Sequence, residues 1–195
     1  PAAACGAGAE VPVALLAGLQ ESRIVCAESL DKADAAKVCS AIFTDAKNSP
    51  PIRIAALRGM MKADGPTAAP LVVAAIKGKP GYIKQGALRL VASAQCKCLT
   101  AAASGALASL PAADQLKVLD VLGQRGDIGA LKGVSALYSS SSADVKLAAY
   151  KTAGRIGDTA CIKPLVELTN DTDHGISQKA VEALGIIDNK AVDAK

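Results

Sequence analysis

The chain has 195 residues, of which 51% are hydrophobic but only 2% aromatic, with one Phe, three Tyr and no Trp. A sandwich or barrel normally needs more aromatic and β-branched residues in alternating runs, so this composition argues against an all-β fold and for helices packed through Ala, Leu, Val and Ile. The net charge of +4 is too weak on its own to indicate nucleic-acid binding. No apolar run approaches the roughly 18 residues of a membrane span.

Residues 1–10 are predicted to form a flexible leader. They are rich in Ala and Gly, as are the residues around a signal-peptide cleavage site, although neither an initiator Met nor an apolar segment precedes them. The six cysteines are compatible with either an oxidising or a reducing compartment. The compartment therefore stays open, with an extracytoplasmic location favoured over a cytoplasmic one.

Residues 11–49 are predicted to form a degenerate N-terminal region of helical repeats. The expected helices are Val11–Gln20, Arg23–Leu30 and Lys32–Ala46. Cys26 and Cys39 lie on either side of the turn at Asp31–Asp34, where they would face each other across a helix hairpin. If the protein is extracytoplasmic, this pair is the best candidate for a disulfide.

From Pro50 onwards the chain repeats every 31 residues. The first column of the repeat is apolar in four of its five members, Ile52, Ile83, Asp114, Val145 and Ile176. Apolar residues follow four, five and eight positions later in each unit, so they share one face of a helix, which we call helix A. A second column, Val72, Ala103, Val134 and Leu165, marks a second helix, B. Helix B is expected over Pro70–Lys77, Ala101–Ser109, Ile128–Tyr138 and Ala160–Thr169.

The turns repeat at the same phase as the apolar columns. Helix A is followed by Gly-x-x-Gly-Asp, in which Gly123, Gly154 and Gly185 align and are expected to allow a left-handed residue or a close helix approach. Asp127 and Asp158 are expected to cap the next helix. Clusters of Pro, Gly, Ser and Asn separate the units, as at Asn48–Pro51 and Ser139–Ser142.

Together these signals predict an all-α fold, an α-solenoid of antiparallel helix pairs with about five to six units. Residues 50–195 are expected to form one continuous domain, with units near 50–80, 81–111, 112–141, 142–171 and 172–195. The last unit has a helix A at Ile176–Ile187 but only Lys190–Lys195 where helix B is expected. An apolar face left open there would be covered by a longer array or by self-association through the open end.

Two segments carry a family resemblance, Val145–Leu168 and Gln178–Asp188. They resemble units of the bacterial HEAT-like repeats, the group often called phycocyanobilin-lyase-type repeats. The resemblance implies a right-handed superhelix of helix pairs and protein binding on the concave face lined by B helices. It does not imply lyase chemistry.

The sequence offers no catalytic constellation and no cofactor motif, so we expect no enzyme activity, no cofactor and no metal. His174 is the only histidine and falls in the predicted connection Asn170–Gly175. Cys96 and Cys98 form a Cys-x-Cys pair that would give a metal two thiolates, but no further ligands recur at a supporting spacing.

Basic residues recur in two columns of helix A. The first holds Arg53, Lys84 and Lys146, interrupted by Gln115 and Ser177; the second holds Arg58, Arg89 and Lys151, interrupted by Asp120 and Glu182. A solvated helix face explains this ridge, and a contact with an acidic partner or with phosphates is the alternative.

The sequence is therefore interpreted as a protein–protein interaction scaffold that belongs to a larger protein or assembly. The alternatives are a nucleic-acid or polyanion binder that uses the basic ridge, and an accessory domain of an enzyme. The identity of the protein partner does not follow from the sequence.

Overall fold

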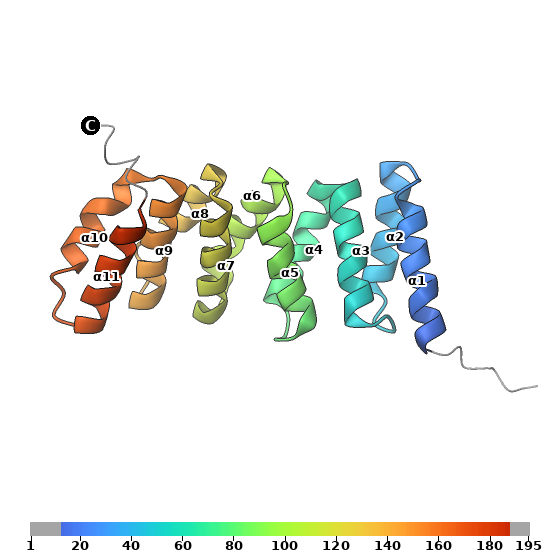
Figure 1. The fold of residues 1–195 in the computed structure, drawn as a ribbon, viewed down its shortest axis with the longest axis horizontal. Coiled ribbons are helices and arrows are strands. Elements are labelled where there is room, and N and C mark those ends of the chain that lie inside the picture. The colour runs from blue at the N-terminus through green and yellow to red at the C-terminus, as the bar shows by residue number, and fades with distance from the viewer. Residues whose placement is uncertain (1–12, 188–195) are drawn as a thin grey trace, which may run out of the picture. The chain divides into compact units, whose positions relative to one another are not determined.

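The computed structural model describes residues 13–187, and this part of the chain is all-helical, with eleven α-helices and no strand (Figure 1). The predicted leader, 1–10, and the predicted remnant of the last unit, Lys190–Lys195, lie outside the described residues. Across 13–187, no helix is both long enough and apolar enough to cross a membrane.

The chain separates into two compact units, with the boundary between Asp64 and Gly65. This boundary falls inside the repeat unit predicted at 50–80, and the division into domains made from the sequence stays a prediction.

Three helices build the first unit, and each packs on the other two: α1 (Val13–Ala27), α2 (Lys32–Thr44) and α3 (Pro50–Ala63). The prediction of two separate helices before residue 31 is wrong, because α1 runs unbroken through Glu21 and Ser22. A polar interruption of an apolar pattern does not end a helix when the residues themselves tolerate helical backbone. Ile42 and Leu57, both at most 2% exposed, lie in the core.

The second unit contains eight α-helices and three short 3-10 turns. The α-helices are α4 (Gly65–Lys77), α5 (Tyr82–Ser93), α6 (Lys97–Ala106), α7 (Ala112–Arg125), α8 (Leu131–Ser135), α9 (Ala143–Ile156), α10 (Ile162–Leu168) and α11 (His174–Ile186). The 3-10 turns are η1 (Leu107–Ser109), η2 (Ile128–Ala130) and η3 (Thr159–Cys161).

The helices of the second unit form two layers, which can be followed in Figure 1. α5, α7, α9 and α11 pack in succession as the helix A layer, while α4, α6 and α8 pack in succession behind them and α10 packs on α9 and α11. The helix B column lies inside, because Val72, Ala103, Val134 and Leu165 are all at most 1% exposed. The repeat read from the sequence is therefore the repeat of the packing.

The helix B predictions were less accurate at their starts. α4 was expected from Pro70 but begins at Gly65, with Pro70 exposed inside the helix and Pro66 at its second position. Proline suits the first turn of a helix, and an exposed interior proline removes one hydrogen bond without ending the helix there. The helices predicted at Ile128 and Ala160 open with 3-10 turns instead of α-helix.

The two glycines of the turn motif Gly-x-x-Gly-Asp have different structural roles. The left-handed residues are the second glycines, Gly126 with φ 65° and Gly157 with φ 97°, and not the aligned Gly123 and Gly154. The first glycine serves close packing, because a Cβ added at Gly154 would lie 2.5 Å from Cγ1 of Ile187. The sequence named both possible roles but did not assign them to positions.

The aspartates of the same motif cap the following helices, as predicted. The Asp127 carboxylate accepts a hydrogen bond from the Gly129 amide at 3.0 Å, and the Asp158 carboxylate accepts one from the Ala160 amide, also at 3.0 Å. Each carboxylate thereby satisfies a backbone donor that the helix itself leaves free.

Replacing Gly126 by Ala should lower the free energy of unfolding by about 1–2 kcal/mol, because an L side chain is strained in the left-handed region. Gly105→Ala in α6 is the matched control: an added Cβ there meets nothing within 4 Å, so it should be neutral or raise the stability by up to about 1 kcal/mol. Urea unfolding followed by circular dichroism measures both. Equal effects of the two substitutions would contradict the assignment of the turn.

Candidate functional site

One member of the first basic column of helix A, Arg53, binds the protein's own backbone. In the first unit, Arg53 Nε donates to the Phe43 carbonyl at 2.7 Å, and its guanidinium lies 5.5 Å from the centroid of the Phe43 ring. Phe43 is the penultimate residue of α2. The side chain therefore supplies a donor to the carboxyl end of the preceding helix, which has carbonyls without partners.

In the second unit, the residues that interrupt the basic column make the same kind of contact. Gln115 Nε2 donates to the Leu107 carbonyl at 3.0 Å, and Ser177 Oγ donates to the Thr169 carbonyl at 2.7 Å. Both acceptors lie at the end of the preceding helix B. Arg53, Gln115 and Ser177 all donate to a carbonyl, so the property that these three members share is hydrogen bonding and not charge.

Lys84, the next member of the column, forms a buried ion pair. Its ammonium lies 2.7 Å from Asp114 Oδ2, and the two side chains are 7% and 12% exposed. Asp114 is the one polar member of the first apolar column, and the pair joins α5 to α7 across successive repeats. A buried charge needs a partner, so the lysine and the aspartate depend on each other.

The predicted basic ridge is therefore not one solvated face. Arg53 and Lys84 engage groups of the protein, whereas Arg58 and Arg89 are exposed and Lys146 and Lys151 are half-buried. The sequence pattern predicted the periodicity of the basic columns correctly but did not predict which of their side chains point toward the protein.

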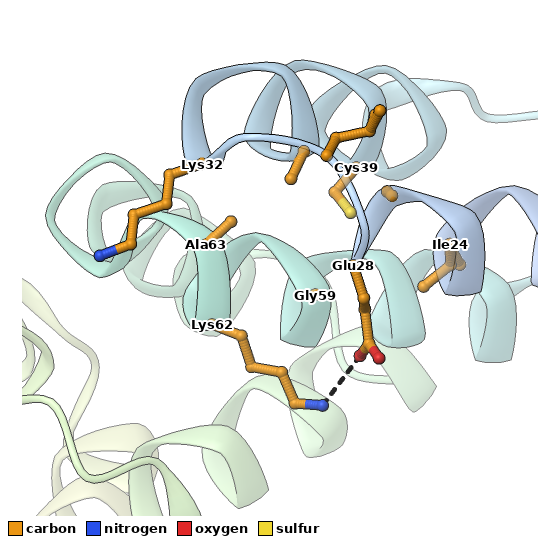
Figure 2. Close-up of a pocket in the computed structure, with 10 residues that line it drawn as sticks. Ile24, Glu28, Lys32, Cys39, Gly59, Lys62 and Ala63 are labelled. Carbon is orange, nitrogen blue, oxygen red and sulfur yellow. Dashed lines mark hydrogen bonds and ion pairs between the residues drawn. The ribbon is translucent and has the colours of Figure 1, made fainter.

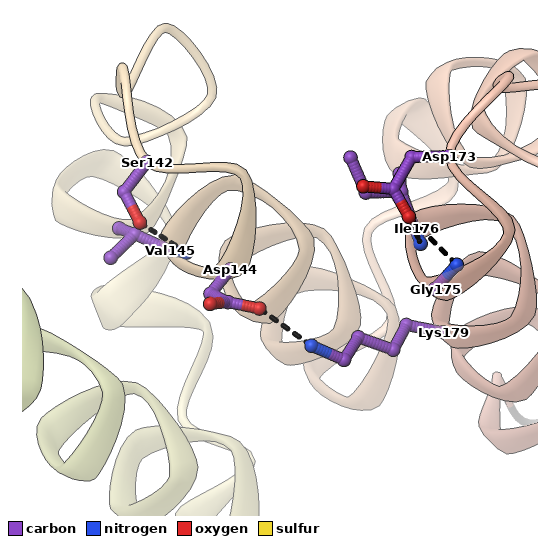
Figure 3. A network of polar contacts seen from close by, with 7 residues as sticks. All are labelled: Ser142, Asp144, Val145, Asp173, Gly175, Ile176 and Lys179. Atoms are coloured by element: carbon purple, nitrogen blue, oxygen red, sulfur yellow. Dashed lines mark hydrogen bonds and ion pairs between the residues drawn. The ribbon is translucent and has the colours of Figure 1, made fainter.

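A polar network ties α9 to α11 in the second unit (Figure 3). Lys179 Nζ lies 2.7 Å from Asp144 Oδ1, Ser142 Oγ accepts from the Val145 amide, and Asp173 Oδ1 accepts from the Gly175 amide at 2.8 Å. His174, which was predicted in a connection, is the exposed first residue of α11, directly after its cap Asp173. The network stabilises helix starts and brings no imidazole to a pocket.

Arg125 is a site residue that the sequence did not single out. Its guanidinium donates to the carbonyls of Val91 at 2.8 Å, Cys96 at 2.9 Å and Ala94, and its Nε donates to Thr100 Oγ1 at 2.7 Å. One side chain at the end of α7 therefore closes the turn between α5 and α6. No column repeats it, because position 156 of the next unit is Ile.

Cys96 and Cys98 are joined by a disulfide in that turn. The alternative in which the pair offers two thiolates to a metal is thus corrected, since sulfurs bonded to each other are poor ligands. Within residues 13–187 there is no cluster of three or more His, Cys, Asp or Glu side chains arranged to hold a metal.

The disulfide predicted between Cys26 and Cys39 is not formed, and both are free thiols. Cys39 is buried, whereas Cys26 is exposed. α1 turns Ile24 and Ala27 toward the rest of the unit, and Cys26, next to Ala27, points about a third of a turn away. Proximity of the two helices was predicted from the hairpin, but the helical phase of α1 was not.

A pocket of about 300 Å³ lies in the first unit, with Cys39 in its lining and the Glu28–Lys62 ion pair, at 2.9 Å, on its wall (Figure 2). Ile24, Ala35 and Gly59 supply apolar and small surface. Burial, and then the charge of Glu28, raises the pKa of the Cys39 thiol. The thiol is therefore protonated near neutral pH and is a weak nucleophile.

α1 carries apolar side chains on its outer face as well as on its inner one. Leu15 and Leu19 are 65% and 56% exposed and lie one turn apart, and Val25 is 67% exposed. Ile24 and Ala27 face the core. We call Leu15, Leu19 and Val25 the α1 outer face, and it combines more large exposed apolar side chains than any other helix within the described residues.

The B helices of the second unit present a different surface, a shallow groove of about 420 Å³ between α6 and α8. Small residues line it, together with Lys132. The helices approach closely there because Gly133 lies against the Ser104 carbonyl, which a Cβ would overlap. This groove belongs to the layer that the family resemblance associates with protein binding.

Comparison with known proteins agrees with this architecture. Residues 131–194 match the family model of HEAT repeats. The structure of human deoxyhypusine hydroxylase in complex with glycerol is similar with a TM-score of 0.52 at 13% identity, over 93% of this chain and 82% of that chain. No curated protein matches the sequence. At this level of identity the structural likeness concerns the fold alone.

The fold and the repeat therefore define the class of the protein, an α-solenoid of paired helices. Within it, residues 131–194 belong to the HEAT-repeat family.

Asp114→Ile restores the apolar residue of the column but leaves the Lys84 ammonium buried without a partner. We expect this change to lower the free energy of unfolding by about 3–5 kcal/mol, whereas the double substitution Lys84→Met and Asp114→Ile should lie within roughly 1 kcal/mol of the wild type or exceed it. Denaturant unfolding of the two variants, with Lys84→Met as the third corner of the cycle, measures the coupling. Additive effects would show that the pair is not buried.

Cys161 provides a test that depends on pH. The side chain is fully buried, its Sγ donates to the Asp158 carbonyl at 2.8 Å, and burial, followed by the charge of Asp158, raises the pKa of the thiol from 9.0 to about 11. Because the unfolded chain ionises first, the stability from the neutral buried thiol is fully present below pH 9 and is lost as the pH rises toward 11.

The difference in unfolding free energy between wild type and Cys161→Ala should therefore shrink as the pH rises from 9 to 11, the interval between the two pKa values. Ser135→Ala, at an exposed position without an ionisable group, should show a constant difference over the same interval. A constant difference for Cys161→Ala would contradict the burial of the thiol.

Proposed function

We propose that this protein is a helical-repeat scaffold whose role is to bind another protein, and that the α1 outer face is a contact surface. The HEAT-repeat match and the all-helical architecture support the scaffold. The observation that carries the binding role is that α1 is apolar on both of its faces. A helix of this kind is normally buried all round, and an exposed apolar patch marks an interaction site.

The chemistry of the α1 outer face indicates the kind of partner. Leu15, Leu19 and Val25 have no charged residue between them on that face, while Glu21 and Arg23 are exposed at its border. This is the arrangement of a protein interface, with an apolar centre and a polar rim. Burying each of the three side chains is worth about 1.5–3 kcal/mol, so the complement is an apolar surface, such as the apolar face of a partner helix.

Two observations favour protein binding over the alternatives from the sequence. Arg53 and Lys84 contact the protein itself and do not project toward an external polyanion. The exposed His174 does not line the pocket of the first unit, the pocket beside Arg125 or the groove between α6 and α8, and a protonated Cys39 is poorly suited to nucleophilic chemistry. We therefore propose no catalytic role.

Replacing both Leu15 and Leu19 by Ser should abolish binding of the physiological partner, with a loss of at least about tenfold in affinity, because the apolar centre of the interface is removed. Ile128→Ser is the matched control, since Ile128 is 73% exposed and lies in the second unit. The test is quantitative affinity purification from the native source with the wild type and both variants as bait.

A protein recovered with the wild type and with Ile128→Ser, but not with the double variant, supports the proposal, and a second copy of the chain counts as such a partner. Equal recovery with all three baits would contradict the role of α1. Binding of duplex DNA that weakens steeply with salt would favour the polyanion alternative.

A further inference from the structure

The Cys96–Cys98 disulfide lies at the start of a helix and is accessible. Cys96 is the residue before the first turn of α6, Cys98 lies in that turn, and both are half-buried. Attack on a disulfide requires access of a thiolate to one of its sulfurs. Cys39 and Cys161, in contrast, are buried free thiols.

The turn that carries the disulfide is held by other contacts. Arg125 donates to the carbonyls of Val91, Ala94 and Cys96, and the Thr100 hydroxyl donates to Asp127 Oδ2 at 2.7 Å. A disulfide constrains the unfolded chain more as the closed loop lengthens, and these cysteines are separated by only two positions. The bond therefore adds little to the fold, and the turn is expected to persist without it.

The surroundings favour the reduced form of the pair. Thiolates are stabilised at helix N-termini and beside cations, and α6 supplies the former. Lys97 stands between the two cysteines, and the Arg125 guanidinium contacts the Cys96 carbonyl at 2.9 Å. A disulfide whose reduced form is stabilised is more easily reduced.

An open pocket of about 410 Å³ adjoins this turn. Lys97 and Arg125 line it with positive charge, Gln95 and Gln124 add amide groups, and Asp127 contributes a carboxylate that is already bonded to Thr100 and Gly129. Neither cysteine lines the pocket, but Lys97 stands between them in the chain and Arg125 contacts the Cys96 carbonyl. These two cations would attract a small thiol that carries carboxylates to the turn that holds the disulfide.

We propose that Cys96–Cys98 is a redox-active disulfide that exchanges with small anionic thiols of the glutathione type. The thiolate attacks one sulfur, the Cys96–Cys98 bond breaks, and a mixed disulfide forms while the other cysteine leaves as a thiolate. A second glutathione thiolate then attacks the mixed disulfide, which releases glutathione disulfide and the second cysteine. Two glutathione thiols are oxidised and one protein disulfide is reduced, so the electrons balance.

Reduction of the Cys96–Cys98 disulfide affects the contact of its sulfurs with α4. A Cβ added at Gly65, the first residue of α4, would lie 3.0 Å from Cys96 Sγ and 3.1 Å from Cys98 Sγ, so both sulfurs pack against the start of that helix. Reduction lets the sulfurs separate and alters this contact. The site therefore couples the redox state to packing within the second unit.

The first experiment treats the native chain, purified without reductant, with glutathione, removes the glutathione by rapid desalting, and labels the free thiols of the still-native protein with a maleimide for peptide mass spectrometry. We expect Cys96 and Cys98 to become labelled in the native protein while Cys39 and Cys161 do not. Treated with glutathione disulfide in place of glutathione, Cys98→Ser should form a mixed disulfide between Cys96 and glutathione with release of one glutathione thiolate, and Cys26→Ser should behave as the wild type under both treatments. A bond that glutathione reduces only in denaturant, or thiols that are already free before treatment, would overturn the proposal.

The second experiment tests the charge of the pocket. Lys97→Glu should slow reduction by glutathione relative to reduction by neutral 2-mercaptoethanol by roughly three- to fivefold, as expected for reversing one exposed charge near the reacting sulfur. An unchanged ratio would overturn the selectivity for an anionic thiol. Both results are independent of the proposed function, because the residues that carry them, Cys96, Lys97 and Cys98, lie in the second unit and not in α1.

Discussion

Several helices in the described part of this protein end against a neighbouring helix, and their last carbonyls find donors there. The structure meets this constraint with side chains from the following helix A: Arg53 reaches the end of α2, Gln115 the residue after α6, and Ser177 the residue after α10. Arg125 does the same for the end of α5. Unsatisfied buried carbonyls cost about 1–3 kcal/mol each, so a stack of short helices depends on these contacts as much as on its core.

The composition of the core follows from the same geometry. With one Phe and no Trp, the layers rely on Ala, Val and Leu, which let helices approach closely. Gly133 against the Ser104 carbonyl shows how near two backbones come, and Gly154 leaves room for the side chain of Ile187. Close packing in turn brings Lys84 within 2.7 Å of Asp114, and this buried pair replaces an apolar contact in the column.

Much of this fold follows from the sequence, because a 31-residue period leaves a signature in both the apolar columns and the turns. The helix B column and the Asp127 and Asp158 caps were predicted at the residue level. The direction of polar side chains was not predicted. A lysine on a helix looks the same in sequence whether its side chain is solvated or pairs with a carboxylate one repeat later. For the same reason the exposed position of Cys26 was not predicted, because it depends on which face of α1 packs on the rest of the first unit.

The candidate contact surface on α1 was only partly visible in the sequence. The apolar stretch before Gln20 was apparent, but its exposure depends on which side of α1 packs on α2 and α3. The Cys96–Cys98 pair was noticed as a possible pair of metal ligands, and the contacts of Arg125 that give the turn its different character come from a residue 27 or more positions away in the chain.

The most direct test of this account is the free energy of unfolding of Gln115→Leu. If Gln115 closes the preceding helix, the Leu107 carbonyl loses its side-chain donor and keeps only the Leu110 amide, so the stability should fall by about 0.5–1.5 kcal/mol. Lys117→Leu, at an exposed position of the same helix, should change it by less than about 0.5 kcal/mol. An unchanged stability of Gln115→Leu would show that this column is an ordinary solvated face and that the helix ends are satisfied in another way.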